Sequence, residues 1–220
     1  MPTSVKENYL KALYFLNKED SRISVTELSN RLNVSKPSAN NMIKSLQEHS
    51  WVMYEKYKPL QLTEEGRKAA AKVIRKHRLT EMFLVDIMGF GWEEVHEIAE
   101  QVEHINSEKL FARMDEMLGR PSFDPHGSPI PDEKGEILEQ KYFSLSDLQM
   151  GQKAQLCAIA NSSKELLHYL NKLDIQLGTI FQVLKTESFD NSLSISYDEK
   201  SPIMISEKVS RSLLVKKLPS

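Results

Sequence analysis

Apolar positions spaced three and four residues apart dominate the first 120 residues and predict a largely helical N-terminal half. The stripe over 5–16 predicts a first helix with Ser4 as its N-cap. A short helix over 25–31 and a turn at 32–34 follow, and Ser35 is placed to cap the next helix. The residues of that helix expected to face the core are Ala39, Met42, Ile43 and Leu46.

The outward face of this helix and the segment after it are polar and basic. Two short strand-like runs, 51–54 and 60–63, are predicted to form a hairpin. A capped second helix and a basic hairpin predict a winged helix-turn-helix, in which the helix enters a major groove and the wing contacts phosphates. A helical domain with merely solvated lysines is the alternative. The residues expected to face DNA are Lys36, Ser38, Asn40, Asn41 and Lys44 on the helix, and Lys56 and Lys58 in the hairpin.

The middle of the chain is predicted to be helical. A long helix capped by Thr63 ends near Met88, before the helix-breaking sequence Gly-Phe-Gly at 89–91. More than one of its faces is apolar, so a partner subunit is a natural second contact. Two more helices are predicted over 92–105 and 107–119.

The last third of the chain has a different pattern. Residues 121–145 are rich in proline, glycine and charge and are predicted to form a linker. Beyond them the apolar runs shorten to strand length, which predicts a small β domain with one short helix over 165–173. The predicted strands cover 154–160, 180–184, 192–197, 203–205 and 213–215.

The net charge of −2 hides an asymmetry along the chain. Residues 1–80 carry 15 Lys and Arg against 8 Asp and Glu, a net charge of +7, whereas the remainder carries 14 against 23, a net charge of −9. A basic N-terminal third is the charge distribution expected of a DNA-binding segment, although segments of a chain also vary without function. No apolar run reaches the roughly 18–20 residues of a membrane span, and no signal pattern opens the chain, so we expect a cytoplasmic protein without a membrane partner.

Histidines and glutamates gather between residues 77 and 104. His77 and Glu81 are four residues apart, and the run H-E-I-A-E-Q-V-E-H occupies 96–104. Side chains three and four residues apart share a helix face, so this run places four such groups together. Nitrogen and oxygen donors without a thiolate suit a divalent transition metal, and a solvated polar face is the alternative. The four groups on this face are His96, Glu100, Glu103 and His104.

The chain resembles the diphtheria toxin repressor family of iron- and manganese-dependent bacterial repressors. The resemblance covers nearly the whole length and rests on the helix-turn-helix, R-K-H-R-L-T-E at 75–81, V-H-E-I-A-E-Q-V-E-H-I-N-S at 95–107 and P-H-G-S-P-I-P at 125–131. It implies a mainly α fold with a small β part. The implied domains are a winged helix-turn-helix (1–72), a helical dimerisation and metal-binding domain with its linker (73–140) and an SH3-like (FeoA-like) β-barrel (141–220).

The resemblance also implies metal ligands. His126 in the P-H-G loop matches a ligand position of streptococcal-type relatives, and Asp124 stands where those relatives have a cysteine. Glu165 is the candidate for a polar residue that the barrel sends toward the ancillary site. The implied primary-site ligands are Asn8, Glu100, Glu103 and His104, and the implied ancillary-site ligands are His77, Glu81 and His96. The residues that match DNA-facing positions of the recognition helix are Ser35, Pro37, Ser38 and Asn41.

Three departures from the family bear on the metal. Asn8 replaces the usual Met or Asp and offers an oxygen without charge. Lys11 replaces an acidic residue that is frequent in the manganese branch, which argues against the two-metal site of that branch. Glu100 replaces the cysteine of the iron branch, and a carboxylate is a harder ligand than a thiolate. We therefore expect Mn(II) first and Fe(II) second, with Zn(II), Co(II) or Ni(II) binding in vitro.

The expected function is that of a metal-dependent transcriptional repressor that binds palindromic operator DNA as a homodimer and controls metal-uptake genes. Bound metal is expected to pin the first helix and to set the two recognition helices about 34 Å apart, one turn of DNA. The alternatives are a helix-turn-helix regulator with a purely structural metal site and a di-metal carboxylate enzyme. Glu93 and His96 form one Glu-x-x-His motif of the kind that di-iron bundles use twice, but Gln101 spoils the second copy. We expect no catalytic residues and no enzymatic activity.

Overall fold

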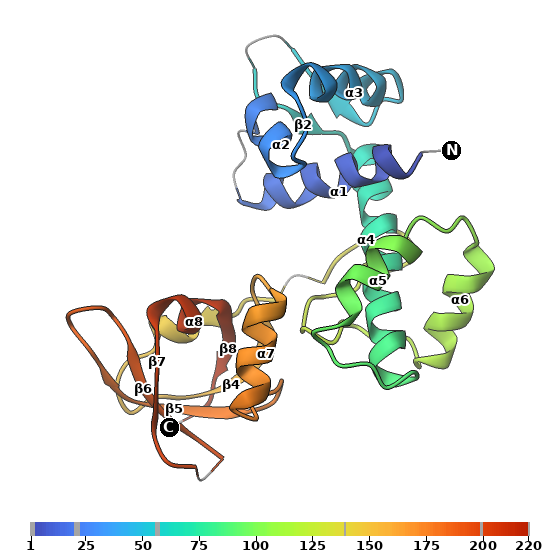
Figure 1. Ribbon diagram of the computed structural model, residues 1–220. Coiled ribbons are helices and arrows are strands. Elements are labelled where there is room, and N and C mark those ends of the chain that lie inside the picture. The colour runs from blue at the N-terminus through green and yellow to red at the C-terminus, as the bar shows by residue number, and fades with distance from the viewer. Residues whose placement is uncertain (1–2, 20–22, 56–57, 139, 199, 220) are drawn as a thin grey trace. The chain divides into compact units, whose positions relative to one another are not determined.

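The computed structural model describes residues 3–19, 23–55, 58–138, 140–198 and 200–219 (Figure 1). The chain forms two compact units. Unit 1 consists of Met1–Thr80, Glu97–Ser122 and Ile130–Leu138. Unit 2 consists of Glu81–His96, Phe123–Pro129 and Glu139–Ser220.

The N-terminal part of unit 1 is the winged helix-turn-helix that the sequence predicts. Its three helices enclose an apolar core in which Leu10, Leu28 and Ile43 are fully buried, whereas Met42 is half-buried. The antiparallel hairpin pairs Val52 with Leu62. The elements are α1 (Ser4–Glu19), α2 (Val25–Arg31), α3 (Lys36–Glu48), β1 (Val52–Met53) and β2 (Gln61–Leu62).

Local sequence explains where these helices begin. The Ser35 side chain accepts a hydrogen bond from the first turn of α3, as an N-cap does. Asn33, in the turn before it, has a φ of 52°, a left-handed conformation that Asn adopts more readily than most residues. The prediction that Ser4 caps α1 is wrong: Ser4 is already helical, and Thr3 before it accepts a hydrogen bond from the Lys6 N–H.

Three more helices follow: α4 (Glu64–Asp86), α5 (Val95–Val102) and α6 (Glu108–Met117). The Thr63 hydroxyl caps α4 as predicted. The predicted helix over 92–105 is too long, because residues 92–94 form turns and α5 ends at Val102. Glu103 and His104 follow in a turn, although the Glu103 N–H keeps a helical hydrogen bond of 2.9 Å to the carbonyl of Ala99.

The first part of the predicted linker over 121–145 is packed structure. Phe123 pairs with Pro129 in an antiparallel bridge, and Asp124 and His126 between them are buried. Ile130 is also buried. The prediction is wrong here because proline and glycine also build tight turns, and composition alone does not separate a turn from a linker.

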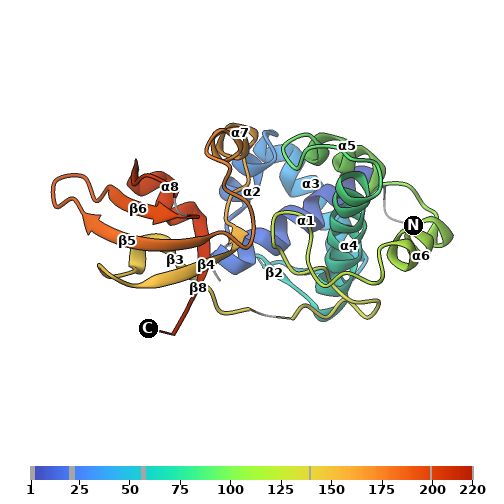
Figure 2. The same ribbon diagram turned by 90° about the horizontal axis from the view of Figure 1, so that it is seen from below.

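The C-terminal part of unit 2 is a small β domain, as predicted. Its strands form one antiparallel sheet in the order β3-β8-β4-β5-β6-β7, and Figures 1 and 2 show β5 and β6 side by side. Leu145, Phe181 and Val215 lie in its core. None of the helices in the described part of the chain has the length and apolar character of a membrane span. The elements are β3 (Phe143–Ser144), η1 (Leu145–Asp147), β4 (Lys153–Ile159), α7 (Lys164–Lys172), β5 (Ile180–Thr186), β6 (Leu193–Tyr197), β7 (Ile203–Ile205), α8 (Glu207–Ser212) and β8 (Leu213–Lys217).

Candidate metal centres and DNA-facing surface

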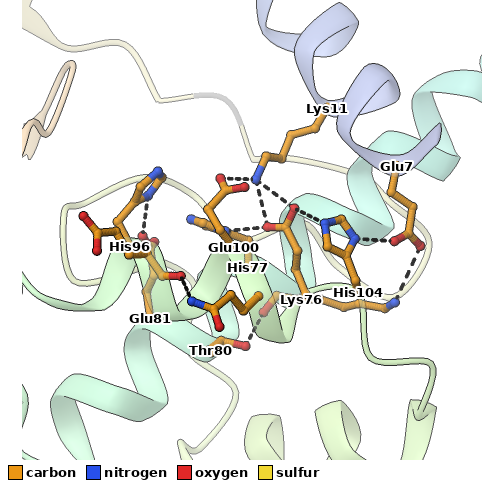
Figure 3. A network of polar contacts seen from close by, with 12 residues as sticks. Glu7, Lys11, Lys76, His77, Thr80, Glu81, His96, Glu100 and His104 are labelled. Atoms are coloured by element: carbon orange, nitrogen blue, oxygen red, sulfur yellow. Dashed lines mark hydrogen bonds and ion pairs between the residues drawn. The ribbon is translucent and has the colours of Figure 1, made fainter. Parts of the chain in front are cut away.

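Unit 1 contains a cluster of charged side chains that we call centre 1. Glu103, which is 0% exposed, supplies the central carboxylate of this cluster. On α4, His77 Nδ1 lies 2.5 Å from Glu103 Oε2. Because an ionised carboxylate can only accept a hydrogen bond, the histidine is the donor. Ligand atoms of His77, Glu100 and Glu103 lie within 4.8 Å of one another, close enough to hold one metal ion. The residues of centre 1 are Glu7, Lys11, His77, Glu100, Glu103 and His104 (Figure 3).

The charge state of Glu103 follows from its neighbours. Burial on its own would raise the pKa of this carboxyl, but the hydrogen bond from His77 and the positive charge of Lys11 outweigh it. The pKa of Glu103 therefore lies below its ordinary value. An ionised carboxylate in a buried position is a strong ligand for a cation.

Lys11 of α1 reaches the same carboxylates. Its Nζ lies 2.6 Å from Glu100 Oε1 and 2.9 and 2.8 Å from the two carboxylate oxygens of Glu103. Figure 3 shows the Lys11 ammonium group next to the carboxylate of Glu100. Three N–H donors thus meet three carboxylate oxygens, so the lysine links α1 to the segment around residues 100–103.

Glu7 is a residue of centre 1 that sequence reasoning missed. Its Oε2 accepts a hydrogen bond from His104 Nδ1 at 2.6 Å (Figure 3). This bond fixes the tautomer of His104 and leaves Nε2, which lies 3.7 Å from Glu103 Oε1, as the ring nitrogen that can ligate. A carboxylate behind a histidine is the usual arrangement around metal-binding imidazoles. The i, i+4 spacing of Glu7 and Lys11 was the signal available in the sequence.

Asn8 has an unusual environment. Among the described residues, its side-chain Oδ1 is the buried polar atom that lacks a hydrogen-bond partner. Asn8 lies three positions before Lys11, so both side chains point from one face of α1. A buried oxygen without a partner costs on the order of 1–3 kcal/mol, and a bound cation would remove that cost. The structure therefore fits the predicted role of Asn8 without testing it.

Unit 2 contains a second group, which we call centre 2: Glu81, Asp124 and His126. All three are buried, and their ligand atoms lie within 4.8 Å of one another. His126 donates from Nε2 to the Trp92 carbonyl at 2.8 Å, which leaves Nδ1 facing Glu81 Oε2 at 3.8 Å. Burial would lower the pKa of His126, but Glu81, Asp124 and the Trp92 carbonyl outweigh it and raise that pKa.

The loop that carries His126 is anchored on β4. The His126 carbonyl accepts from the Ile159 N–H at 2.9 Å, and Gly127 follows with a φ of 84°. A Cβ atom on Gly127 would lie 2.1 Å from the Cys157 carbonyl oxygen. The Gly of the P-H-G motif is thus required by its backbone conformation and by the close approach to the strand.

Gly127→Ala is expected to destabilise unit 2 by about 1–3 kcal/mol, because a left-handed backbone and a clash with β4 act together. Gly151→Ala is the matched control, since Gly151 has a φ of 85° and open space around it. Urea unfolding of the two variants measures the difference. Equal stability of the two variants would show that the approach to β4 does not matter.

The remaining predicted ligands, His96 and Glu165, belong to unit 2. His96 Nδ1 lies 3.2 Å from Glu81 Oε1 in unit 2. The predicted ancillary site joins His77 of unit 1 to Glu81 and His96 of unit 2, and it stays a prediction. Glu165 lies exposed in the first turn of α7, and its role as a ligand also stays a prediction.

The surface of α3 agrees with a DNA-facing role. Asn40 is half-buried, Lys58 is exposed in the hairpin and pairs with Glu55 at 2.6 Å, and Lys56 lies outside the described residues. An exposed ion pair of this kind is weak, so Lys58 can exchange Glu55 for a phosphate. The other predicted DNA-facing residues are all exposed: Ser35, Lys36, Pro37, Ser38, Asn41 and Lys44.

A winged helix-turn-helix joined to buried clusters of carboxylates and imidazoles defines a class, the metal-responsive DNA-binding proteins. Residues 1–60 match the iron-dependent repressor N-terminal DNA-binding domain, residues 63–132 the iron-dependent repressor metal-binding and dimerisation domain, and residues 143–217 the FeoA domain. The diphtheria toxin repressor of Corynebacterium glutamicum is 30% identical over 192 residues, which cover 82% of this chain and 84% of that protein. The chain belongs to the diphtheria toxin repressor family.

Other relatives differ in their metal. The iron-dependent repressor IdeR of Mycobacterium tuberculosis is 37% identical over 125 residues, but these residues are 57% of this chain and only 54% of that protein. A manganese-dependent transcriptional repressor solved in complex with manganese is 30% identical, with a TM-score of 0.87 over 97% of this chain and 100% of the other. ScaR with bound Cd2+ is 32% identical, with a TM-score of 0.80 over 97% of this chain and 99% of the other.

Proposed function

We propose that the chain is a metal-activated, homodimeric transcriptional repressor that binds operator DNA and controls metal-uptake genes. One observation carries the proposal. Centre 1 brings α1 of the DNA-binding domain against Glu100, Glu103 and His104 of the segment that matches a metal-binding domain. The binding of a cation at this junction would change how firmly α1 is held, and α1 is part of the core that supports α3.

The residues of centre 1 fit a divalent metal. We propose that Asn8, Glu100, Glu103 and His104 hold it, with Glu7 orienting His104 from behind. The orphaned oxygen of Asn8, the ionised state of Glu103 and the fixed tautomer of His104 support this set. A bound divalent cation supplies two positive charges to ligands that carry two negative ones. His77 holds Glu103 in place from the other side.

The donor set favours Mn(II), with Fe(II) second. Carboxylate, amide and imidazole ligands without a thiolate suit Mn(II) and leave softer ions without their preferred sulfur ligand. The same argument applies to centre 2, where Asp124 supplies an oxygen. We propose centre 2, with His96, as an ancillary site in which a metal would stabilise the loop over 123–129.

Partners follow from the exposed surfaces. The polar face of α3 and the basic hairpin would bind a palindromic duplex, since a symmetric dimer presents two such helices. Exposed apolar side chains lie in the segment that matches a dimerisation domain, among them Ile87, Met88 and Met117. Such side chains are costly in water and suit the interface of a homodimer.

Glu7→Gln is expected to lower the Mn(II) affinity by about 10–100-fold, because loss of the carboxylate behind a ligating histidine has an effect of that size. The exposed Glu65 offers a matched control, since Glu65→Gln removes the same charge from the first turn of α4. Competition against a fluorescent chelator gives both affinities. An unchanged affinity in Glu7→Gln would remove His104 from the proposed ligand set.

The proposed function itself is tested by selecting duplexes from a random pool with the full chain in Mn(II). Recovery of one palindromic sequence, with half-sites about one or two DNA turns apart, is the expected result. Recovery of no enriched sequence with Mn(II) or Fe(II) would contradict a sequence-specific repressor.

A further inference from the structure

Lys11 is the charged group of centre 1 that the proposed metal ligands do not explain. Its side chain is only 14% exposed, and that of its partner Glu103 is 0% exposed. The ammonium group lies within 2.9 Å of three carboxylate oxygens. These oxygens belong to two of the four residues proposed as metal ligands. The lysine therefore holds the atoms that the metal needs.

Two cations cannot share these carboxylates without cost. Like charges a few ångströms apart repel strongly wherever water is largely excluded, as it is around Glu103. The ammonium also engages both oxygens of Glu103, which leaves that carboxylate with few lone pairs for a metal. A metal that binds Glu100 and Glu103 must therefore move the ammonium group away.

We propose that Lys11 is a built-in competitor for the metal, whose ammonium group neutralises Glu100 and Glu103 in the metal-free protein and is displaced when a divalent cation binds. The inference rests on the proposed metal site. It makes Lys11 a residue that sets the metal concentration at which the repressor responds. An ammonium group in this place keeps the buried Glu103 and the half-buried Glu100 neutralised at low metal, at the cost of a weaker metal affinity.

The competition also links the metal to α1. In the metal-free protein Lys11 ties α1 to Glu100 and Glu103, and Glu7 ties it to His104. Displacement of the ammonium exchanges one of these ties for another, so the contact between α1 and this segment is retained but remade. Metal binding would thus change the position of α1 without first having to attract a detached helix.

The test is the Mn(II) affinity of Lys11→Gln and Lys11→Met, measured by chelator competition on the full chain. Both variants are expected to bind Mn(II) at least about 10-fold more tightly than the unmodified protein, because the ammonium group that competes for the carboxylates has been removed. Lys11→Arg keeps the charge and is expected to stay within about 3-fold of the unmodified affinity. The metal-free melting temperature should fall in Lys11→Gln and rise more on addition of Mn(II) than it does in the unmodified protein.

Lys72→Met is the matched control, because it removes an exposed charge from α4, the helix that carries His77. Its Mn(II) affinity is expected to be unchanged. Equal or weaker Mn(II) binding by Lys11→Gln would overturn the inference, since the ammonium would then assist the ligands instead of competing with the metal. If Lys11→Met does not fold, the Mn(II) affinity of Lys11→Gln tests the inference, because the glutamine amide can still hydrogen-bond to the carboxylates.

Metal-dependent DNA binding by the unmodified chain is measured alongside. If the unmodified chain shows no metal-dependent DNA binding, the proposed function is wrong. If it shows such binding but the Lys11 variants bind Mn(II) with unaltered affinity, only this inference is wrong.

Discussion

Glu103→Gln is expected to abolish the metal-dependent binding of DNA and to weaken Mn(II) binding at least about 100-fold, since a lost ligand has a larger effect than a lost outer neighbour. Glu103 is the fully buried carboxylate of centre 1, and it bonds to both His77 and Lys11. A neutral amide of the same size keeps the shape of the site and removes the charge. Fluorescence anisotropy of labelled DNA and chelator competition give the two quantities.

The control for this substitution lies on α5, the helix that ends just before Glu103. Glu97→Gln removes an equal charge from the exposed side of α5 and is expected to change neither quantity by more than about 2-fold, because exposed charges interact weakly. A Glu103→Gln protein that folds and still responds to Mn(II) as the unmodified protein does would show that centre 1 is not the activating site. Circular dichroism establishes that the variant is folded.

Reversal of two charges on α3 is expected to have an effect of similar size on DNA binding but none on the metal. Lys36→Glu combined with Lys44→Glu should lower DNA affinity at least about 100-fold and reduce the salt slope of binding by about 2, since each lysine is expected to contact one phosphate. The Mn(II) affinity should remain that of the unmodified protein. Anisotropy titrations at several salt concentrations measure both the affinity and the slope.

Two exposed lysines of α7, Lys164 and Lys172, provide the control for net charge. Their reversal to Glu changes the total charge equally and is expected to leave the salt slope within about 1 of the unmodified value, because long-range charges are screened. A loss of affinity as large in this pair as in the α3 pair would mean that overall charge, not a DNA-facing helix, governs binding.

The fold of this chain is largely readable from its sequence because its signals are local. The periodicity of apolar residues, the Ser35 and Thr63 caps and the strand-length runs after residue 145 act through neighbours in the chain. The prediction that residues 121–145 are a linker is wrong in its first part. Burial of Asp124 and His126 comes from contacts with β4 and with Trp92, which a local composition does not contain.

The candidate site is harder to predict from the sequence, because it depends on contacts between segments that are far apart along the chain. Glu7 and His104 are 97 positions apart, and Lys11 and Glu103 are 92 apart. Helical spacing placed Glu100, Glu103 and His104 together but not their partners on α1. It also placed His96 on the same helix face, and the structure has His96 next to Glu81, the residue with which the family resemblance groups it. Residue types and spacing thus identify donors, and the tertiary fold decides which donors meet.

The most direct test of metal activation is the anisotropy of the full chain on a duplex from its own promoter, first with a chelator and then with Mn(II). We expect DNA affinity to rise by about 5–150-fold on addition of Mn(II), the range of ordinary coupling between two binding sites, and to fall again when the chelator is restored. Tight DNA binding that is the same with chelator and with Mn(II) or Fe(II) would contradict metal activation and reduce both centres to structural elements.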